Sequence, residues 1–203
     1  MGTVGGCVFA HNPSLPAGEG QIFWLPELSP STLILESAPA GFQLASAGDP
    51  NTLGIVLADR QDADGRELVI GDISGELHIR LRAAEAALRP AVLLPADAAF
   101  ALRLDVARRF IGRLRGRPMQ LLPPALRLRP PQKHHLIQFL HTADVIDAGG
   151  GAREVAGLVL KSEQAFLPSA EWKDSAIRRH AIRLIRGSAA LIESGYLKIL
   201  QGH

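Results

Sequence analysis

The chain has 203 residues, which is enough to bury a sizeable core in one domain or in two small ones. Its single cysteine, Cys7, excludes an internal disulfide and a zinc site built from cysteines, as is typical of proteins of the reducing cytoplasm. The N-terminal residues lack the pattern of a secretory signal, and no apolar stretch has the length of a membrane span. We therefore expect a cytoplasmic protein.

The charges are distributed unevenly along the chain, although the net charge is only +2. Residues 1–102 hold five Arg and no Lys against twelve Asp and Glu, a net charge of −7. Residues 103–203 hold seventeen Lys and Arg against eight acidic residues, a net charge of +9. A basic half favours an acidic or phosphate-rich partner, and an acidic half can neutralise it or keep the chain in solution.

The first half is predicted to be rich in strands. Leu77, Ile79 and Leu81 alternate with polar residues, which is the period of a half-buried strand. Asp64-Gly65 separates two apolar runs and signals a hairpin. The runs of branched and aromatic residues cover 21–28, 32–37, 41–45, 53–59, 67–72 and 76–83. We therefore predict a small antiparallel sheet within residues 1–94.

After Pro95 the helical period replaces the strand pattern. Asp97 is predicted to cap a first, Arg-rich helix that ends at Gly116. A second helix is predicted from Pro131 to the glycines at 149–151, where the chain must turn sharply. A short third helix over 152–160 follows, and a polar connection over 161–171 leads to the last helix.

The last predicted helix runs from Trp172 to the end of the chain and has one apolar and one cationic face. Four arginines, Arg178, Arg179, Arg183 and Arg186, fall outside its apolar stripe. The stripe consists of Ile177, Ala181, Leu184, Ile185, Ser188, Leu191 and Ile192. Such a helix can read DNA, and it can equally be a surface helix with solvated charges.

The order of the last helices is that of a helix-turn-helix unit, at about residues 131–200. The short helix would cross the DNA backbone, and the last helix would enter the major groove. Candidate contacts near base edges are Lys173, Ser175, Arg178 and Arg179, while Arg183 and Arg186 are placed for phosphates. One feature departs from this pattern, because the connection over 161–171 is longer than the usual turn of about three or four residues.

No enzyme, cofactor or metal site is predicted. His141 and Asp144 lie on neighbouring turns of one helix, a spacing that metal sites use, but no further residue completes a ligand set. The glycines at 149–151 precede Ala-Arg-Glu and not Lys-Ser/Thr, so they do not form a phosphate-binding loop. We interpret His141 and the neighbouring His134 and His135 as solvated residues of the predicted helix.

Several motifs together resemble a known family. They are Phe23-Trp24, the Arg-rich helix after Asp97, Gly149 to Ala156, Trp172, Arg178, Arg183 to Arg186, and Gly195-Tyr196-Leu197 to Leu200. These residues resemble the proteobacterial domain of unknown function 2285, most closely from Asp97 to Leu200. The resemblance implies a variant helix-turn-helix domain of transcriptional regulators, including activators and antiactivators that control integrative and conjugative elements.

The resemblance also implies roles for single residues. It makes Arg178, Arg179, Arg183 and Arg186 DNA contacts and Arg153 a candidate phosphate contact. It further implies that Gly195-Tyr196 ends the last helix. Some members of that family bind and disable other regulators, so both DNA and protein stay open as the ligand.

We therefore expect an α+β protein with an acidic, strand-rich region over 1–94 and a basic helical region over 95–203. The expected function is sequence-specific binding of duplex DNA to regulate transcription, as an activator linked to mobile-element transfer, a setting that comes from the resemblance. The alternative is an antiactivator that sequesters another transcriptional regulator. A homodimer and contacts with another regulator or RNA polymerase stay open as further partners.

Overall fold

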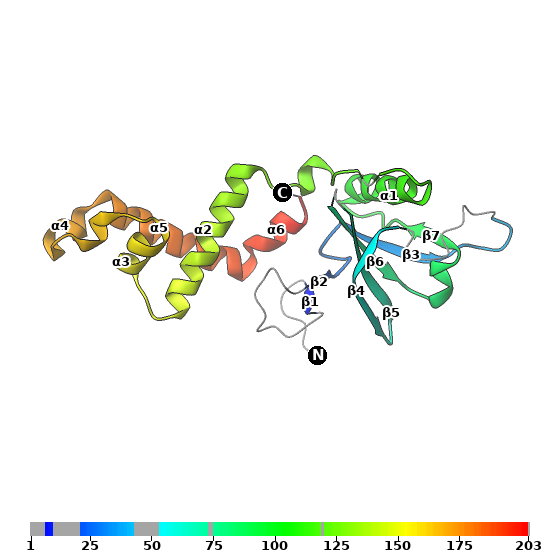
Figure 1. Cartoon of the computed structure of the whole chain (residues 1–203), viewed down its shortest axis with the longest axis horizontal. Helices are drawn as coiled ribbons and strands as arrows, with labels where there is room; N and C mark the ends of the chain where they lie inside the picture. Colours follow the sequence, from blue (N-terminus) through cyan, green and yellow to red (C-terminus); the bar gives the residue numbers. More distant parts are fainter. Residues whose placement is uncertain (1–6, 10–20, 43–52, 73–74, 119, 203) are drawn as a thin grey trace. The chain divides into compact units, whose positions relative to one another are not determined.

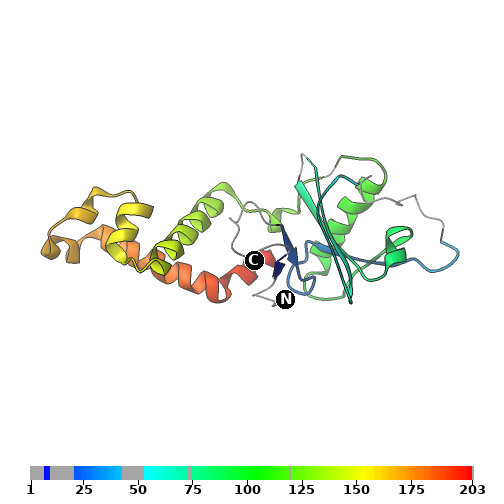
Figure 2. The same cartoon turned by 60° about the horizontal axis from the view of Figure 1, so that its bottom comes forward.

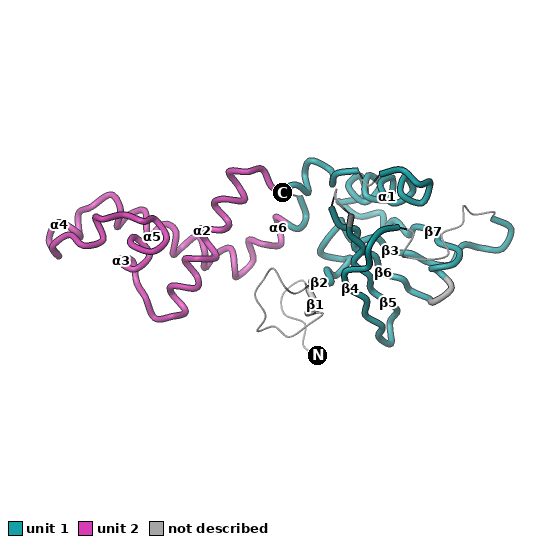
Figure 3. The backbone as a smooth tube through the Cα atoms, viewed as in Figure 1, with its two compact units in different colours: residues 1–127, 200–203 teal, residues 128–199 magenta. Residues whose placement is uncertain are grey.

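The computed structural model describes residues 7–9, 21–42, 53–72, 75–118 and 120–202. The chain forms two compact units: residues 1–127 together with 200–203 make up unit 1, and residues 128–199 make up unit 2 (Figure 3). The strands lie in unit 1, and most of the helices lie in unit 2. The predicted α+β class is confirmed.

Unit 1 is built on a five-stranded sheet with the order β4-β5-β6-β3-β7 (Figure 1). Its strands are β3 (Thr32–Ser37), β4 (Ile55–Asp62), β5 (Gly65–Asp72), β6 (Gly75–Leu81) and β7 (Pro90–Leu93). A separate antiparallel pair consists of β1 (Cys7–Phe9) and β2 (Ile22–Trp24). One pair departs from the prediction: β3 and β6 are parallel. A long connection and not a hairpin follows β3, so no tight turn fixes its direction.

The predicted hairpin is present between β4 and β5. Gly65 follows its turn with a φ of 139°, and a Cβ at this position would collide with the carbonyl oxygen of Leu81. Glycine is required there because it alone adopts such a φ at little cost. Of the strand predicted over 41–45, residues 43–45 lie outside the described residues, and Gly41 and Phe42 are not in a strand.

One face of the sheet packs against α1 (Phe100–Leu114), which lies next to the sheet in both views (Figures 1 and 2). The alternating residues Leu77, Ile79 and Leu81 are buried in the same core as Val106 and Phe110 of the helix. The predicted first helix is confirmed, but its N-cap is Ala99 and not Asp97. The carboxylate of Asp97 instead accepts from the N–H of Ala99, in the turn before the helix. Because α1 contributes to this core, unit 1 extends to residue 127, past the change of composition near residue 94.

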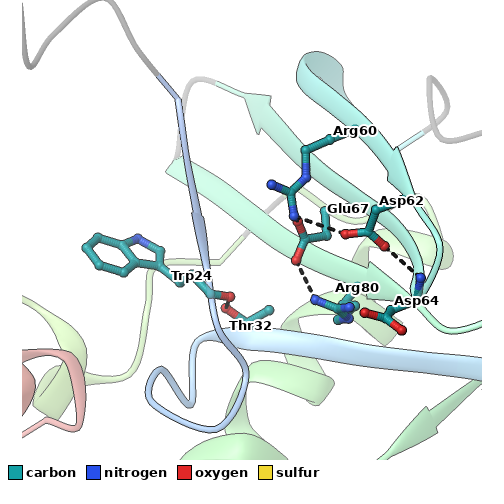
Figure 4. Close-up of polar contacts among 7 residues, drawn as sticks. All are labelled: Trp24, Thr32, Arg60, Asp62, Asp64, Glu67 and Arg80. Carbon is teal, nitrogen blue, oxygen red and sulfur yellow. Dashed lines mark hydrogen bonds and ion pairs between the residues drawn. The ribbon is translucent and has the colours of Figure 1, made fainter. Parts of the chain in front are cut away.

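The opposite face of the sheet carries a buried carboxylate between two arginines (Figure 4). Glu67 on β5 accepts hydrogen bonds from Arg60 on β4, at 2.5 Å, and from Arg80 on β6, at 2.7 Å. The guanidinium of Arg60 also lies 5.3 Å from the ring centroid of Phe23 on β2. Burial of a carboxylate is tolerable here because two cations and their N–H groups replace its hydration.

The described residues of unit 2 form helices and the turns that connect them, without a strand. Its elements are α2 (Pro130–Asp147), α3 (Ala152–Glu154) continued by a π-helical segment (Val155–Val159), a 3₁₀ turn (Glu163–Phe166), α4 (Ser169–Asp174), α5 (Ala176–Ala190), a second π-helical segment (Leu191–Gly195) and most of α6 (Tyr196–Leu200). The second and third predicted helices are confirmed, and the connection over 161–171 holds a 3₁₀ turn and the start of α4.

Two predictions about the last helix are wrong. It does not begin at Trp172, because the backbone of Ser175 is extended, with φ −68° and ψ 144°, and separates α4 from α5. It also does not end at Gly195-Tyr196, since the chain stays helical to Leu200. Glycine ends a helix mainly when it adopts a positive φ, and Gly195 does not.

A tight turn that contains three glycines, at 149–151, joins α2 to α3. Gly149 has a φ of 83°, which ends α2. A Cβ on Gly150 would lie 2.8 Å from the carbonyl oxygen of Val145, so only glycine allows this close approach. The predicted turn is confirmed. In the described parts of the chain, we find no helix with the length and apolarity needed to cross a membrane.

Candidate nucleic-acid interface

The core of unit 2 fixes the position of α5. Trp172 on α4 is 7% exposed and is buried in one cluster with Ala156, Ala181 and Leu184. Alanines at such positions allow helices to pack closely. On the side facing α2, a Cβ on Gly187 would lie 2.5 Å from the ring of Phe139, so the ring packs directly against the glycine. A well-packed helix of this kind fixes the backbone positions from which its outer side chains extend.

The outer face of α5 is cationic. Arg179, Arg183 and Arg186 follow each other at spacings of four and three, so they share one side of the helix, and all three are exposed. This side is opposite the buried residues Ala181, Leu184 and Ser188. No acidic residue occurs in α5, and none of the three arginines forms an ion pair with any described residue. We call these three residues the α5 arginine face.

The start of α5 is fixed by hydrogen bonds to α4. The hydroxyl of Ser175 accepts from the N–H of Arg178, at 3.2 Å, and donates to the carbonyl of Trp172, at 2.8 Å. It is therefore the N-cap of α5. Arg178 and Arg179 donate through Nη1 to the last carbonyls of α4, those of Lys173 and Asp174, at 3.3 and 2.9 Å.

These bonds leave the two guanidinium groups at the N-terminal end of α5 with several N–H groups still available, since each carries five. The free backbone N–H groups and the positive end of the helix dipole lie in the same place, which favours an anion. Lys173 is exposed on the last turn of α4 and adds a further positive charge. The region therefore suits a phosphate or the acceptor edge of a base.

Arg153 lies apart from the α5 arginine face and is half-buried. Its Nη1 donates to the carbonyl of Ala165 at 3.1 Å, and its guanidinium lies 5.1 Å from the ring centroid of Trp172. It thus links α3 to the 3₁₀ turn and to the core. Next to it, the N–H of Gly151 donates to Glu154 at 2.8 Å and holds the pKa of that carboxyl below its ordinary value.

The histidine and aspartate considered for a metal do lie on neighbouring turns of α2. Nδ1 of His141 and Oδ2 of Asp144 are 3.9 Å apart, and both side chains are largely exposed. Within the described ranges, no three His, Cys, Asp or Glu side chains are grouped closely enough to hold a metal ion.

A cationic helix mounted on a compact helical unit is one arrangement that nucleic-acid-binding domains use. Comparison with family models then identifies the class. Residues 93–201 match the RovC DNA-binding-domain family, described as "T6SS, Transcription factor, DNA binding domain". The match covers more than half of the 203 residues, so the chain belongs to this family of DNA-binding transcription-factor domains.

Two further results complete the comparison. Residues 31–92 match a second family, described as a domain of unknown function, DUF7012. Curated proteins and solved structures give no match. The matches support a DNA-binding regulator family, but they do not name domain of unknown function 2285, which stays a resemblance. The first match begins just before α1, although α1 packs in unit 1.

Proposed function

We propose that this protein regulates transcription by sequence-specific binding of duplex DNA through the α5 arginine face. The observation that carries the proposal is this face itself: three exposed arginines without an acidic partner in the described residues, on a helix that the unit 2 core holds in place. Such a face is matched by the evenly spaced phosphates of a duplex. Membership of a DNA-binding-domain family supports the same ligand.

We assign the residues as follows within a helix-turn-helix arrangement in which α5 enters the major groove. Arg178 and Arg179, at the N-terminal end of α5, contact base edges. Arg183 and Arg186 contact phosphates further along the helix. Ser175 acts by fixing where α5 starts, because both bonds of its hydroxyl are internal. Lys173 and Arg153 are flanking phosphate contacts.

The direction of regulation is a separate proposal. Activation in a mobile-element setting, through contact with RNA polymerase or another regulator, is supported by the sequence resemblance alone. The description of the matched family names T6SS instead. A promoter fusion carrying the selected DNA site would measure the direction: increased transcription with the protein supports activation, and decreased transcription contradicts it.

The test of DNA binding is a selection from a randomised duplex pool with the full chain at moderate salt, read by sequencing. The matched variants each remove three positive charges. One replaces Arg179, Arg183 and Arg186 by Gln, and the control replaces Arg108, Arg115 and Arg127, exposed arginines of unit 1, by Gln. We expect the control to enrich the parental motif and the α5 variant to enrich none. No motif with the parental chain, or equal behaviour of the two variants, would overturn the proposal.

The antiactivator alternative is favoured by a different observation in unit 2. Leu158 and Phe166 are 68% and 85% exposed, at the end of the π-helical segment and in the following 3₁₀ turn. Exposed apolar side chains of this size are common in protein interfaces. If Phe166→Ser abolishes regulation while leaving duplex binding unchanged, the protein partner is supported. If the α5 variant abolishes regulation and Phe166→Ser does not, regulation depends on the binding of DNA.

A further inference from the structure

A second surface of unit 2 is formed by one side of α2. Lys133, Ile137, Leu140 and Asp144 follow each other at spacings of four, three and four, which places them in a single stripe along the helix. All four are exposed, and the two central side chains are apolar: Ile137 is 41% and Leu140 is 56% exposed. We call these four residues the α2 stripe.

The α2 stripe is not part of the core of unit 2. The residues of α2 that pack inward, among them Phe139, Thr142 and Ile146, lie on the opposite side of the helix. Thr142 is fully buried, and its hydroxyl donates to the carbonyl of Gln138 at 2.7 Å. The helix is therefore apolar on two sides, one of which packs against its own unit.

The order of charges along the α2 stripe indicates what covers it. A positive residue stands at one end, a negative residue at the other, and two apolar residues lie between them. When two such helices lie antiparallel about a two-fold axis midway between Ile137 and Leu140, Ile137 of each copy faces Leu140 of the other. The same axis places Lys133 of each copy opposite Asp144 of the other, so the stripe is complementary to itself.

We propose that this protein forms a two-fold symmetric homodimer through antiparallel packing of the α2 stripes of two copies. The pairing is isologous: each copy contributes the same patch, and each contact occurs twice. The apolar residues exclude water at the centre, and the charges at the ends fix direction and register, as charged flanking residues do in coiled coils. The α5 arginine face lies on another helix, so a dimer carries two such faces. The inference does not rest on DNA binding.

The test uses two charge-reversal variants. Each variant alone is expected to form a homodimer only weakly, whereas an equimolar mixture of the two is expected to form a heterodimer. Lys133→Asp places Asp opposite Asp in its own homodimer, and Asp144→Lys places Lys opposite Lys. In an equimolar mixture, each copy of one variant meets the opposite charges of the other at both ends. A parallel pairing would place Lys opposite Lys and Asp opposite Asp already in the parent. Only the antiparallel pairing of positions 133 and 144 therefore predicts that the parent and the mixture dimerise while each variant alone does so only weakly.

The measurement is sedimentation equilibrium of the full chain at low salt, with native mass spectrometry to separate homodimers from heterodimers. We expect each variant to weaken homodimerisation about tenfold or more, because both ends become repulsive, and the mixture to return within about threefold of the parental dissociation constant. Glu163→Lys, an exposed charge reversal of unit 2 outside α2, should dimerise like the parent.

The outcomes separate a docking surface from a folding defect. Heterodimer formation requires both variants to be folded, so its recovery supports the proposal directly. Ile137→Asp places a charge at the centre of the pairing. It should abolish the dimer when it is introduced into the parental chain, and also when it is introduced into both charge-reversal variants of the mixture. A parental chain that stays monomeric at millimolar concentration would overturn the proposal. A mixture no tighter than its components, or variants that dimerise like the parent, would overturn it as well.

Discussion

The helices α1 and α5 carry four arginines each and use them in opposite ways. In α1, the guanidinium of Arg103 is buried and donates to Asp97, at 2.8 Å, and to the carbonyl of Pro26, at 2.9 Å. Arg109 donates to the carbonyl of Gln120, at 2.6 Å. In α5, three of the four arginines point outward from the core without an acidic partner among the described residues.

The difference shows that the density of arginine in an amphipathic helix does not identify a nucleic-acid surface. Three of the four arginines of α1, Arg103, Arg109 and Arg113, donate to backbone carbonyls of other segments of unit 1. Arg113, for instance, donates to the carbonyl of Leu53 at 2.5 Å. A buried guanidinium needs such partners, because an unpaired one would cost several kcal/mol, on the order of 3. The two helices differ in whether other segments of the chain offer hydrogen-bond acceptors to their arginines. The spacing of residues along one helix does not show this.

The strongest test of this contrast is Arg103→Ala in α1. We expect it to lower the free energy of unfolding by about 3 kcal/mol, because it removes a buried charge network and leaves the carbonyl of Pro26 without its donor. Arg108→Ala, an exposed arginine of the same helix, should change stability by less than about 0.5 kcal/mol. Chemical denaturation measures both. Equal effects of the two substitutions would contradict the assignment of α1 to a structural role.

The second test concerns how α5 is held. Gly187→Ala places a Cβ against the ring of Phe139 and should lower the free energy of unfolding by about 1–3 kcal/mol. Phe139→Leu should reduce the penalty, since a smaller side chain makes room. A double-mutant cycle by thermal unfolding measures the coupling. Additive effects of the two changes would show that α2 and α5 do not meet at this point.

The third test measures whether the exposed arginines contact phosphate. Arg183→Gln should weaken binding of the selected duplex about tenfold. It should also reduce the magnitude of the negative slope of log affinity against log salt concentration by about one. Arg115→Gln, an exposed arginine that follows α1, is the matched control and should leave both values unchanged. Fluorescence anisotropy over a salt series gives both numbers. An unchanged slope for Arg183→Gln would remove this residue from the interface.

The fourth test separates base reading from backbone contact within α5. Arg178→Ala should relax the preference for the selected motif while retaining binding to unrelated duplexes. Arg186→Ala should weaken binding to all duplexes alike, because a phosphate contact is independent of sequence. The measurement compares affinities for the motif and for a scrambled duplex. If both substitutions reduce all affinities equally, α5 does not read bases through Arg178.

The sequence predicted the regular features of this fold for physical reasons that are local. Alternation gave β6, the Asp64-Gly65 pair gave the hairpin, and the glycines at 149–151 gave the turn between α2 and α3. The parallel pairing of β3 with β6 depends on partners far apart in the chain, so no local pattern predicts it. Its direction follows from the packing of the whole sheet.

The candidate site was predicted less completely. The sequence predicted that Arg178, Arg179, Arg183 and Arg186 lie outside the apolar stripe. In the structure, Arg179, Arg183 and Arg186 are exposed on one face, whereas Arg178 is half-buried. The sequence analysis missed that the helix is interrupted at Ser175. Serine is a common N-cap residue, and here its hydroxyl accepts from the N–H of Arg178, three residues further on. The internal bonds of Arg153 and the α1 arginines depend on tertiary neighbours, Trp172 and the loops of unit 1, that the sequence does not place.

The smallest expected effect is the response of the two units to acid. Hydrogen bonds from Arg103, Arg66 and His78 lower the pKa values of Asp97, Asp59 and Glu76 in unit 1. In unit 2, a hydrogen bond from the N–H of Gly151 lowers the pKa of Glu154. A carboxyl whose pKa is lowered by folding stabilises the folded state above its unfolded pKa, and this contribution is lost as pH falls through the folded value.

We therefore expect stability to decrease as the pH falls below about 5, toward and past the ordinary carboxyl values near 4. The loss should be larger for unit 1 than for unit 2, because Asp59, Glu76 and Asp97 belong to unit 1 and Glu154 belongs to unit 2. Hydrogen exchange at pH 5 and pH 3, corrected for intrinsic rates, resolves β5 and β6 from α5. Arg103→Ala should flatten the pH dependence of unit 1, since Asp97 then titrates near its ordinary value. An equal loss of protection in α5 would mean that shared electrostatics, and not these local pairs, determine the acid response.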